Sequence, residues 1–206
     1  MIQSGITTGT PSRIAFDAGV YFKGIPYDEK VAPTEEAVQK AIIGATQEGG
    51  TVTITPEYFD VPADGAHVLM EELKVKVGET AQMEVSFLEL TAELVKNQVI
   101  GKLADSTDSN FDVITSDEHL RASHFYEGFG YWGHHLDGRE MIIIFKKALC
   151  TSGHVMEAKN KTNSVFKGTF ECHSDIEYGT TKLPYAIFIR KADGWKAVNA
   201  DEVAAA

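Results

Sequence analysis

The alternation of apolar and polar side chains is clearest between Thr80 and Phe87. Every second residue in this run is apolar, and the residues between them are polar or charged. The apolar set is Ala81, Met83, Val85 and Phe87, and the polar set is Thr80, Gln82, Glu84 and Ser86. A period of two residues predicts a β-strand with one buried face and one face in water.

A second run with the same period lies between Thr51 and Glu57. Val52 and Ile54 alternate there with a polar set, which consists of Thr51, Thr53, Thr55 and Glu57. The pair Gly49-Gly50 just before it predicts a turn or a bulge. Neither polar set contains Lys or Arg, so the two strands, paired in one sheet, would present a neutral to acidic surface. An enzyme site would instead gather His, Cys, Asp or Lys in a concavity, and we expect no enzymatic activity.

The connection between the two strands, Val61 to Glu72, is polar and long. Pro62 and Asp64-Gly65 predict a turn in it, and the residues from Leu73 to Val77 predict a short strand. Its apolar side chains are Val68, Leu69 and Met70. Loops of this length in compact domains are usually functional or docked on a partner. The alternative is a loop folded over its own sheet.

The remaining apolar patterns predict a mostly-β protein. Strands are expected at residues 19–23, 141–145, 165–173 and 185–189, and residues 114–135 are expected to form two short strands with tight turns. The run at 141–145, MIIIF, is apolar throughout and predicts a strand buried on both faces. Residues 91–103 have the period of a helix, with Thr91 as N-cap. Residues 35–43 fit a helix or a strand equally well.

We therefore expect one domain over residues 1–206, a β-sandwich or half-barrel with one flanking helix. Residues 1–14 predict an extended N-terminal arm, which would be ordered by docking on a partner such as another subunit, and residues 192–206 a loose C-terminal tail. The chain has 30 acidic against 19 basic residues and a net charge of -11. This balance argues against binding nucleic acid or anionic membranes, which need clustered Lys and Arg.

Neither a transmembrane segment nor a signal peptide is expected, so the chain should be made in the cytosol. Cys150 and Cys172 lack the spacing of metal ligands and predict buried free thiols. His119, His124, His134 and His135 cluster in the sequence, but their spacing does not place them on one face. We expect no catalytic residue, no metal and no cofactor.

An aromatic segment, Phe125 to Trp132, contains several glycines between its rings. Gly128 and Gly130 lack the spacing and the lysine of a phosphate-binding loop. The rings could stack on sugars or bases, although such a run more often forms the edge of a core or a subunit contact.

The run GATQEGGTVTITPEYFDVPADGA, followed by GETAQMEVSFLELTAE leading into a helix, resembles the major tail tube proteins of long-tailed bacteriophages. The resemblance covers residues 10–104, and the run LPYAIFIRK fits the closing strand of that family. Residues 105–160 lie outside it. The shared features are strands, turns and a helix in a set order.

The resemblance implies a β-sandwich with a flanking helix that forms hexameric rings, which stack into the tube through which phage DNA leaves the capsid. Strand edges would pair between subunits into one β-barrel. The lumen wall would be formed by Thr51, Thr53, Thr55, Glu57, Thr80, Gln82, Glu84 and Ser86. The ring-stacking loop would include Val61, Asp64, Gly65, Val68, Leu69 and Met70, and the arm at 1–14 would also contact the next ring.

The implied partners are further copies of the chain, the tape measure protein, the tail terminator and distal tail or baseplate proteins. DNA would pass without specific binding, and the location would be the virion tail, with assembly in the bacterial host cytoplasm. A wall of Thr, Ser, Gln and Glu suits that passage, because it offers phosphates no cation to bind. The alternatives are another tail ring protein, such as a terminator or baseplate component, and a carbohydrate-binding β-sandwich.

Overall fold

The computed structural model describes residues 14–15, 19–65, 68–157, 163–179 and 181–191. The predicted arm at 1–14, Ile14 excepted, and the predicted tail at 192–206 lie outside the described residues. The elements are β1 (Val20–Phe22), α1 (Glu35–Ala41), β2 (Thr46–Asp60), β3 (Lys74–Phe87), α2 (Ala92–Gln98), β4 (Gly101–Ala104), β5 (Val113–Ser116), β6 (Tyr126–His134), β7 (Glu140–Cys150), β8 (Val155–Glu157), β9 (Val165–Cys172) and β10 (Tyr185–Ile189).

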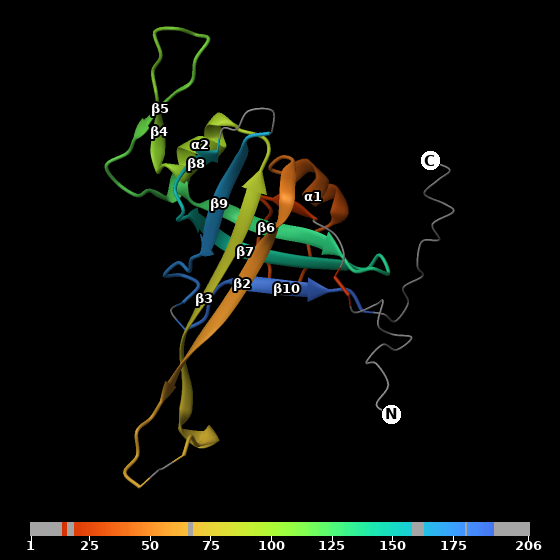
Figure 1. The fold of residues 1–206 in the computed structure, drawn as a ribbon, viewed down its shortest axis with the longest axis vertical. Coiled ribbons are helices and arrows are strands. Elements are labelled where there is room, and N and C mark those ends of the chain that lie inside the picture. Colours follow the sequence, from red (N-terminus) through yellow and green to blue (C-terminus); the bar gives the residue numbers. More distant parts are fainter. Residues whose placement is uncertain (1–13, 16–18, 66–67, 158–162, 180, 192–206) are drawn as a thin grey trace.

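Within the described residues, eight strands form one antiparallel sheet in the order β1-β6-β7-β9-β3-β2, with β10 paired to β7 and β8 paired to β9. Strand β7 is the branch point of this sheet. Its residues 141–145 pair with β10, and its residues 148–150 pair with β9. The sheet therefore divides at β7 into two parts, which run across one another in Figure 1.

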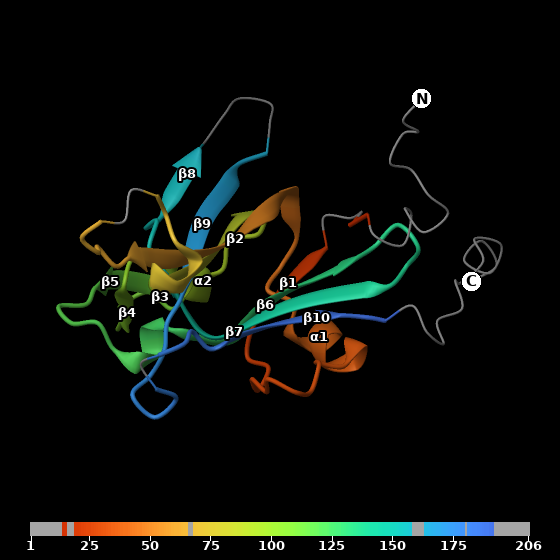
Figure 2. The same cartoon turned by 90° about the horizontal axis from the view of Figure 1, so that it is seen from below.

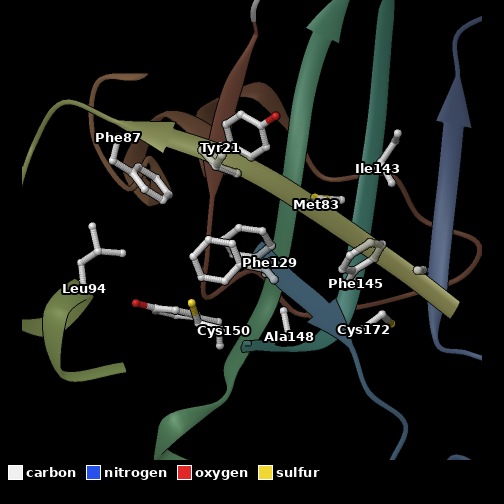
Figure 3. Close-up of a cluster of buried hydrophobic side chains, with 14 of the residues drawn as sticks. Tyr21, Met83, Phe87, Leu94, Phe129, Ile143, Phe145, Ala148, Cys150 and Cys172 are labelled. Atoms are coloured by element: carbon white, nitrogen blue, oxygen red, sulfur yellow. The ribbon is translucent and has the colours of Figure 1, made fainter. Parts of the chain in front are cut away.

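The two parts of the sheet face each other across the main core. Ala81, Met83 and Val85 on β3 lie over Phe129 on β6 and Phe145 on β7, and all of them are buried. Figure 3 shows β3 crossing β6 and β7, with the side chains of Met83, Phe129 and Phe145 between the strands. Two facing β-layers with a shared apolar interior are a sandwich-like arrangement. The predicted mostly-β, sandwich-like fold is confirmed.

A second, smaller core covers the opposite face of the β1-β6-β7-β10 layer. Phe22, Trp132, Ile142 and Ile144 pack there against Val38 of α1, and Figure 2 shows α1 on the face away from β2 and β9. The run at 141–145 is thus enclosed on both faces, as its unbroken apolar sequence predicts. Residues 35–41 form a helix, which resolves the open alternative and gives the fold a second flanking helix.

Helix α2 begins as predicted but ends earlier. The Thr91 hydroxyl accepts a hydrogen bond from the Leu94 amide at 3.2 Å, which is a typical N-cap. The predicted extent to Leu103 is wrong, because the helix ends at Gln98 and Ile100 has a φ of 51°. Residues from Gly101 onward form β4, and the Ile100 carbonyl accepts from the Asp117 amide at 3.0 Å. Tertiary contacts here override the helical period.

Cys150 and Cys172 are separate buried thiols, as predicted. Burial raises the pKa of the Cys172 thiol to about 12, so neither its position nor its protonation favours reactivity at neutral pH. Among the helices of the described residues, none has the length and apolar character that crossing a membrane requires.

Candidate functional surface

Strands β2 and β3 form the longest hairpin of the structure. They pair from Thr46 opposite Phe87 to Asp60 opposite Lys74. The half of the hairpin nearest the helices packs on the main core through the buried side chains of β3. We call the part of the molecule around the two cores the body, and the other half of the hairpin extends away from it (Figure 1). The predicted strands at 73–77 and 80–87 are one continuous strand. The hairpin therefore carries two surfaces, a polar face on the body and an apolar tip beyond it.

The predicted polar residues of both strands lie on one face of the hairpin, opposite the core. Register places Thr51 beside Glu84, Thr53 beside Gln82 and Thr55 beside Thr80. Glu57 lies opposite Gly78, and Ser86 continues the β3 side of the face beyond Glu84. The structure brings all eight together. It shows a shared polar face, while their place in a lumen stays a prediction.

Strand β9 adds a third strand to this face, although it was not among the strands predicted to form the lumen wall. Glu171 lies opposite Gln82, Thr169 opposite Glu84 and Lys167 opposite Ser86. The alternation of β9 was visible in the sequence, but its pairing with β3 spans about 80 residues of chain and could not be read from it. We call the combined surface the polar face. It consists of Thr51, Thr53, Thr55, Glu57, Thr80, Gln82, Glu84, Ser86, Lys167, Thr169 and Glu171.

The charge of the polar face is acidic. Its three carboxylates are Glu57, Glu84 and Glu171, and Lys167 is the one cation in this set. The eight predicted residues of β2 and β3 contribute no lysine to the face, and Lys167 comes from β9, which was not among the predicted wall strands. One ammonium against three carboxylates still leaves a surface that repels phosphate groups.

The layer that carries the polar face has open edges. Within the described residues, β2 pairs with β3 alone, and on the far side β8 pairs with β9 alone. The edge of β2 thus presents backbone N–H and C=O groups along much of its length. Proteins rarely leave such an edge unprotected, because it is a template for pairing with another chain.

A bulge shapes the start of β2. The register shifts between Thr46 and Gly50, and Gly49 has a φ of 68°, which confirms the predicted turn or bulge. A side chain at Gly50 would overlap the Tyr21 hydroxyl and the Glu84 carbonyl. The two glycines therefore allow β2 to lie against β3 and the core, and they leave a shallow hollow in the polar face beside Lys167.

The tip of the hairpin projects from the body with its apolar side chains uncovered. We call residues 58–76 the β2–β3 arm. Val68 is 72% exposed and Leu69 80% exposed, and Val61 and Met70 are also exposed. Asp64 and Gly65 form a turn, with Gly65 at a φ of 85°. All six residues predicted for a ring-stacking loop thus share this tip, and the alternative of a loop folded over its own sheet is wrong.

The arm is held in shape by local bonds. The Val61 amide donates to the Leu73 carbonyl at 2.8 Å, and Lys74 Nζ lies 3.2 Å from Asp60 Oδ1. At its base, the Tyr185 hydroxyl donates to Glu79 Oε1 at 2.8 Å. Burial raises the pKa of Glu79, but hydrogen bonds from Lys76 and Tyr185 outweigh it, and the net pKa is below the ordinary value. The arm is therefore a defined element with an anchored base.

Most of the large side chains in the histidine and aromatic segment are buried or partly buried, and His119 is exposed. Tyr126, Phe129 and Trp132 are buried, so they offer no platform for stacking sugars or bases. His124 Nδ1 accepts from the Arg121 amide at 3.0 Å, so Nε2, which lies 3.0 Å from the Gly101 carbonyl, is the donor there. No three His, Cys, Asp or Glu side chains gather as a metal site in the part of the chain that the structure describes.

Comparisons with known proteins add little to this geometry. The chain matches no protein-family model and no curated protein. Among solved structures, it is similar to a chain from the virion of a native gene transfer agent particle, with a TM-score of 0.37 and 8% sequence identity, over 70% of this chain and 85% of that chain. A likeness at this TM-score assigns neither a fold nor a function.

Proposed function

We propose that this chain is a structural virion protein that assembles into stacked, hexameric rings and so forms the tail tube of a long-tailed bacteriophage. The observation that carries the proposal is the polar face. Eight residues selected from the sequence as lumen candidates share one side of the hairpin and continue onto β9. The tube would work in the virion tail, after assembly in the host cytoplasm.

The chemistry of the polar face supports a conduit for DNA. Binding of DNA to proteins is driven largely by release of counterions when Lys and Arg neutralise phosphates. The polar face has neutral hydroxyl and amide groups, three carboxylates and Lys167. DNA in such a tube would slide without a fixed contact, and no specific DNA binding is expected.

The open edges support assembly into a ring. Pairing of the β2 edge of one copy with the free edge of a neighbouring copy would satisfy the exposed backbone groups of both. Repeated around a closed ring, this pairing would join the β8-β9-β3-β2 layers into one barrel between subunits. The polar face would then lie on the inner surface of that barrel.

The β2–β3 arm supports the stacking of rings. Uncovered apolar side chains at the end of a projecting hairpin indicate a contact with another molecule. In the proposed tube this contact joins successive rings. At the ends of the tube, the tape measure protein, the tail terminator and distal tail or baseplate proteins would be further partners.

The test is assembly of the purified protein. The wild-type protein is expected to sediment as a large polymer, and negative-stain microscopy is expected to show long tubes. The triple variant Val68→Ser, Leu69→Ser and Met70→Ser is expected to keep the circular dichroism of the wild-type monomer and to form no tubes, because its changes lie on exposed side chains. The matched control is Ile176→Ser, which removes an apolar side chain that is 94% exposed elsewhere and should leave tubes intact.

The outcomes separate the candidate functions. A wild-type protein that forms single rings at every concentration would favour a terminator or baseplate component. Tubes formed equally well by the triple variant would overturn the stacking role of the arm. A wild type that stays monomeric and binds glycans would favour the carbohydrate-binding alternative.

A further inference from the structure

A second projecting hairpin remains unexplained by the proposed function. Strands β4 and β5 form a separate two-stranded sheet, joined by the connection 105–112. We call residues 101–116 the β4–β5 arm. Leu103 is 60% exposed and Phe111 67% exposed, and Val113 is also exposed. Large apolar side chains that are exposed together at the end of a projecting hairpin indicate a contact with another molecule.

The base of the β4–β5 arm is nevertheless fixed. The buried His124 ring bonds to the Gly101 carbonyl, and the Asp117 amide bonds to the Ile100 carbonyl at 3.0 Å. A Cβ at Gly101 would lie 2.8 Å from the Ile114 side chain, so the chain also packs tightly where it enters the arm. The arm is thus held at a defined place on the body, as a docking element must be.

The two arms lie at opposite ends of the molecule. Figure 1, drawn with the longest axis vertical, shows the β4–β5 arm at the top and the β2–β3 arm at the bottom. Each end therefore carries apolar side chains without a covering layer. A chain with matching surfaces at its two ends can contact a second copy head to tail, and such a heterologous contact repeats without closing.

We propose that the β4–β5 arm is the acceptor for the β2–β3 arm of the next copy along the axis. The inference rests on the proposed function, because it names the partner surface of the stacking arm. Leu103 and Phe111 of one copy would contact Val68, Leu69 and Met70 of another. The polar faces of the two copies would then follow one another along the same axis.

The size of the contact fits a repeated assembly better than an isolated dimer. Each exposed apolar side chain removes on the order of 100 Å² from water when it is buried, so five of them remove roughly 500 Å². Stable interfaces between two proteins bury about 1,200 to 2,000 Å². One arm pair is therefore too small to hold two copies, whereas several pairs between two rings act together.

Charge predicts the salt dependence of this contact. Both arms have more acidic than basic side chains. The β2–β3 arm carries Asp60, Asp64, Glu71 and Glu72 against Lys74 and Lys76, and the β4–β5 arm carries Asp105, Asp108 and Asp112 against Lys102. Like charges at both surfaces repel, and salt screens that repulsion. Stacking through the arms should therefore strengthen as salt rises, while a contact held by ion pairs would weaken.

The first test is a mixing experiment with two variants. The acceptor variant is the double substitution Leu103→Ser and Phe111→Ser, which removes apolar side chains of the β4–β5 arm. The donor variant is the triple substitution Val68→Ser, Leu69→Ser and Met70→Ser, which removes those of the β2–β3 arm. Each variant alone is expected to form no tubes. In a mixture, rings of one variant keep the intact β2–β3 arms and rings of the other keep the intact β4–β5 arms, so complexes of two rings joined by several arm pairs should appear by sedimentation. Leu120→Ser, at another exposed apolar residue, is the matched control and should form tubes.

The second test is a disulfide between copies. In the double variant Leu69→Cys and Phe111→Cys, oxidation should yield a ladder of linked chains. A mixture of the two single variants should yield a dimer in which peptide mapping finds position 69 of one copy linked to position 111 of the other. The native thiols are buried and should not react. Crosslinks that join two copies of Leu69→Cys instead would show a tip-to-tip contact and overturn the acceptor.

The two proposals fail in different ways. If the acceptor variant forms normal tubes while the donor variant does not, the β4–β5 arm is not the acceptor, and the tube function stands. If neither the wild type nor any variant forms tubes, the proposed function fails, and the acceptor fails with it.

Discussion

Asp175 bonds the connection between β9 and β10 to two lysines of β7. It lies between β9, in the polar layer, and β10, in the other layer. Its carboxylate lies 3.0 Å from Lys146 Nζ and 3.4 Å from Lys147 Nζ, and it accepts from the Tyr178 amide at 2.8 Å. The hydrogen bond from Lys146, with a smaller one from Lys147, lowers the pKa of Asp175 below its ordinary value.

This lowered pKa gives a prediction for acid stability. A carboxyl whose pKa is depressed by folding stabilises the fold above its unfolded pKa and loses that contribution as pH falls through the folded pKa. Asp175→Asn should therefore be less stable than wild type at neutral pH, and the difference should shrink below about pH 4. Urea midpoints across this range measure it. Asp112→Asn controls for the loss of one exposed charge, and a difference independent of pH would contradict the ion pairs.

At the residue scale, alternation in the sequence predicted which side chains face water. Met83 and Val85 are buried and Thr53 and Glu84 are exposed, as the period of two requires. Pairs such as Asp175 with Lys146 could not be predicted, because 29 residues separate them and only the folded sheet brings them together. The burial of the Trp132 ring could not be predicted either, because it depends on where α1 packs in the folded protein.

At the scale of elements, the β2–β3 hairpin could be predicted because its strands are adjacent in the sequence and carry the same period. The place of β9 beside β3 could not, since nothing local records a distant pairing. The end of α2 was also misplaced. Val99 and Leu103 fit the helical period, but the turn at Ile100 and the pairing of β4 with β5 break it. Residues 105–112 consequently connect two strands of an arm.

The open edge of β2 gives a prediction for hydrogen exchange. Along an antiparallel edge strand, about half of the amides point away from the sheet. In the monomer, those amides within Thr46–Asp60 should exchange quickly, and assembly should protect them. The amides of α1, on the opposite side of the β6–β7–β10 layer, serve as the internal control and should not change. Exchange of β2 that is the same in monomers and polymers would argue against pairing at this edge.

At the scale of the whole molecule, the protein has one acidic face and exposed apolar side chains at two opposite ends. The net charge of -11 follows from the sequence, whereas the gathering of Glu57, Glu84 and Glu171 on one face follows from register. The two arms belong to different sheets, the β2–β3 arm to the large sheet and the β4–β5 arm to the separate two-stranded sheet. The neutral to acidic character of β2 and β3 could be predicted from the sequence, whereas the addition of β9 to the face and the placement of the two arms at opposite ends could not.

The polar face gives a prediction for DNA passage. Glu57→Lys with Glu84→Lys changes the face from three carboxylates and one ammonium to one carboxylate and three ammonium groups in each copy. Tubes should still form, and DNA ejection from assembled particles should slow, more so at low salt. Glu118→Lys with Glu177→Lys makes the same change of charge elsewhere on the surface. Normal ejection kinetics in the first variant would count against a lumen position.

The most direct measurement is an electron cryo-microscopy map of the protein assembled alone. For the proposed tube we expect a hollow polymer of stacked rings, with Thr53, Gln82 and Thr169 facing the channel and the β2–β3 arm reaching the next ring. A protein that forms no polymer at any concentration, or a polymer with this face on its outer surface, would contradict it.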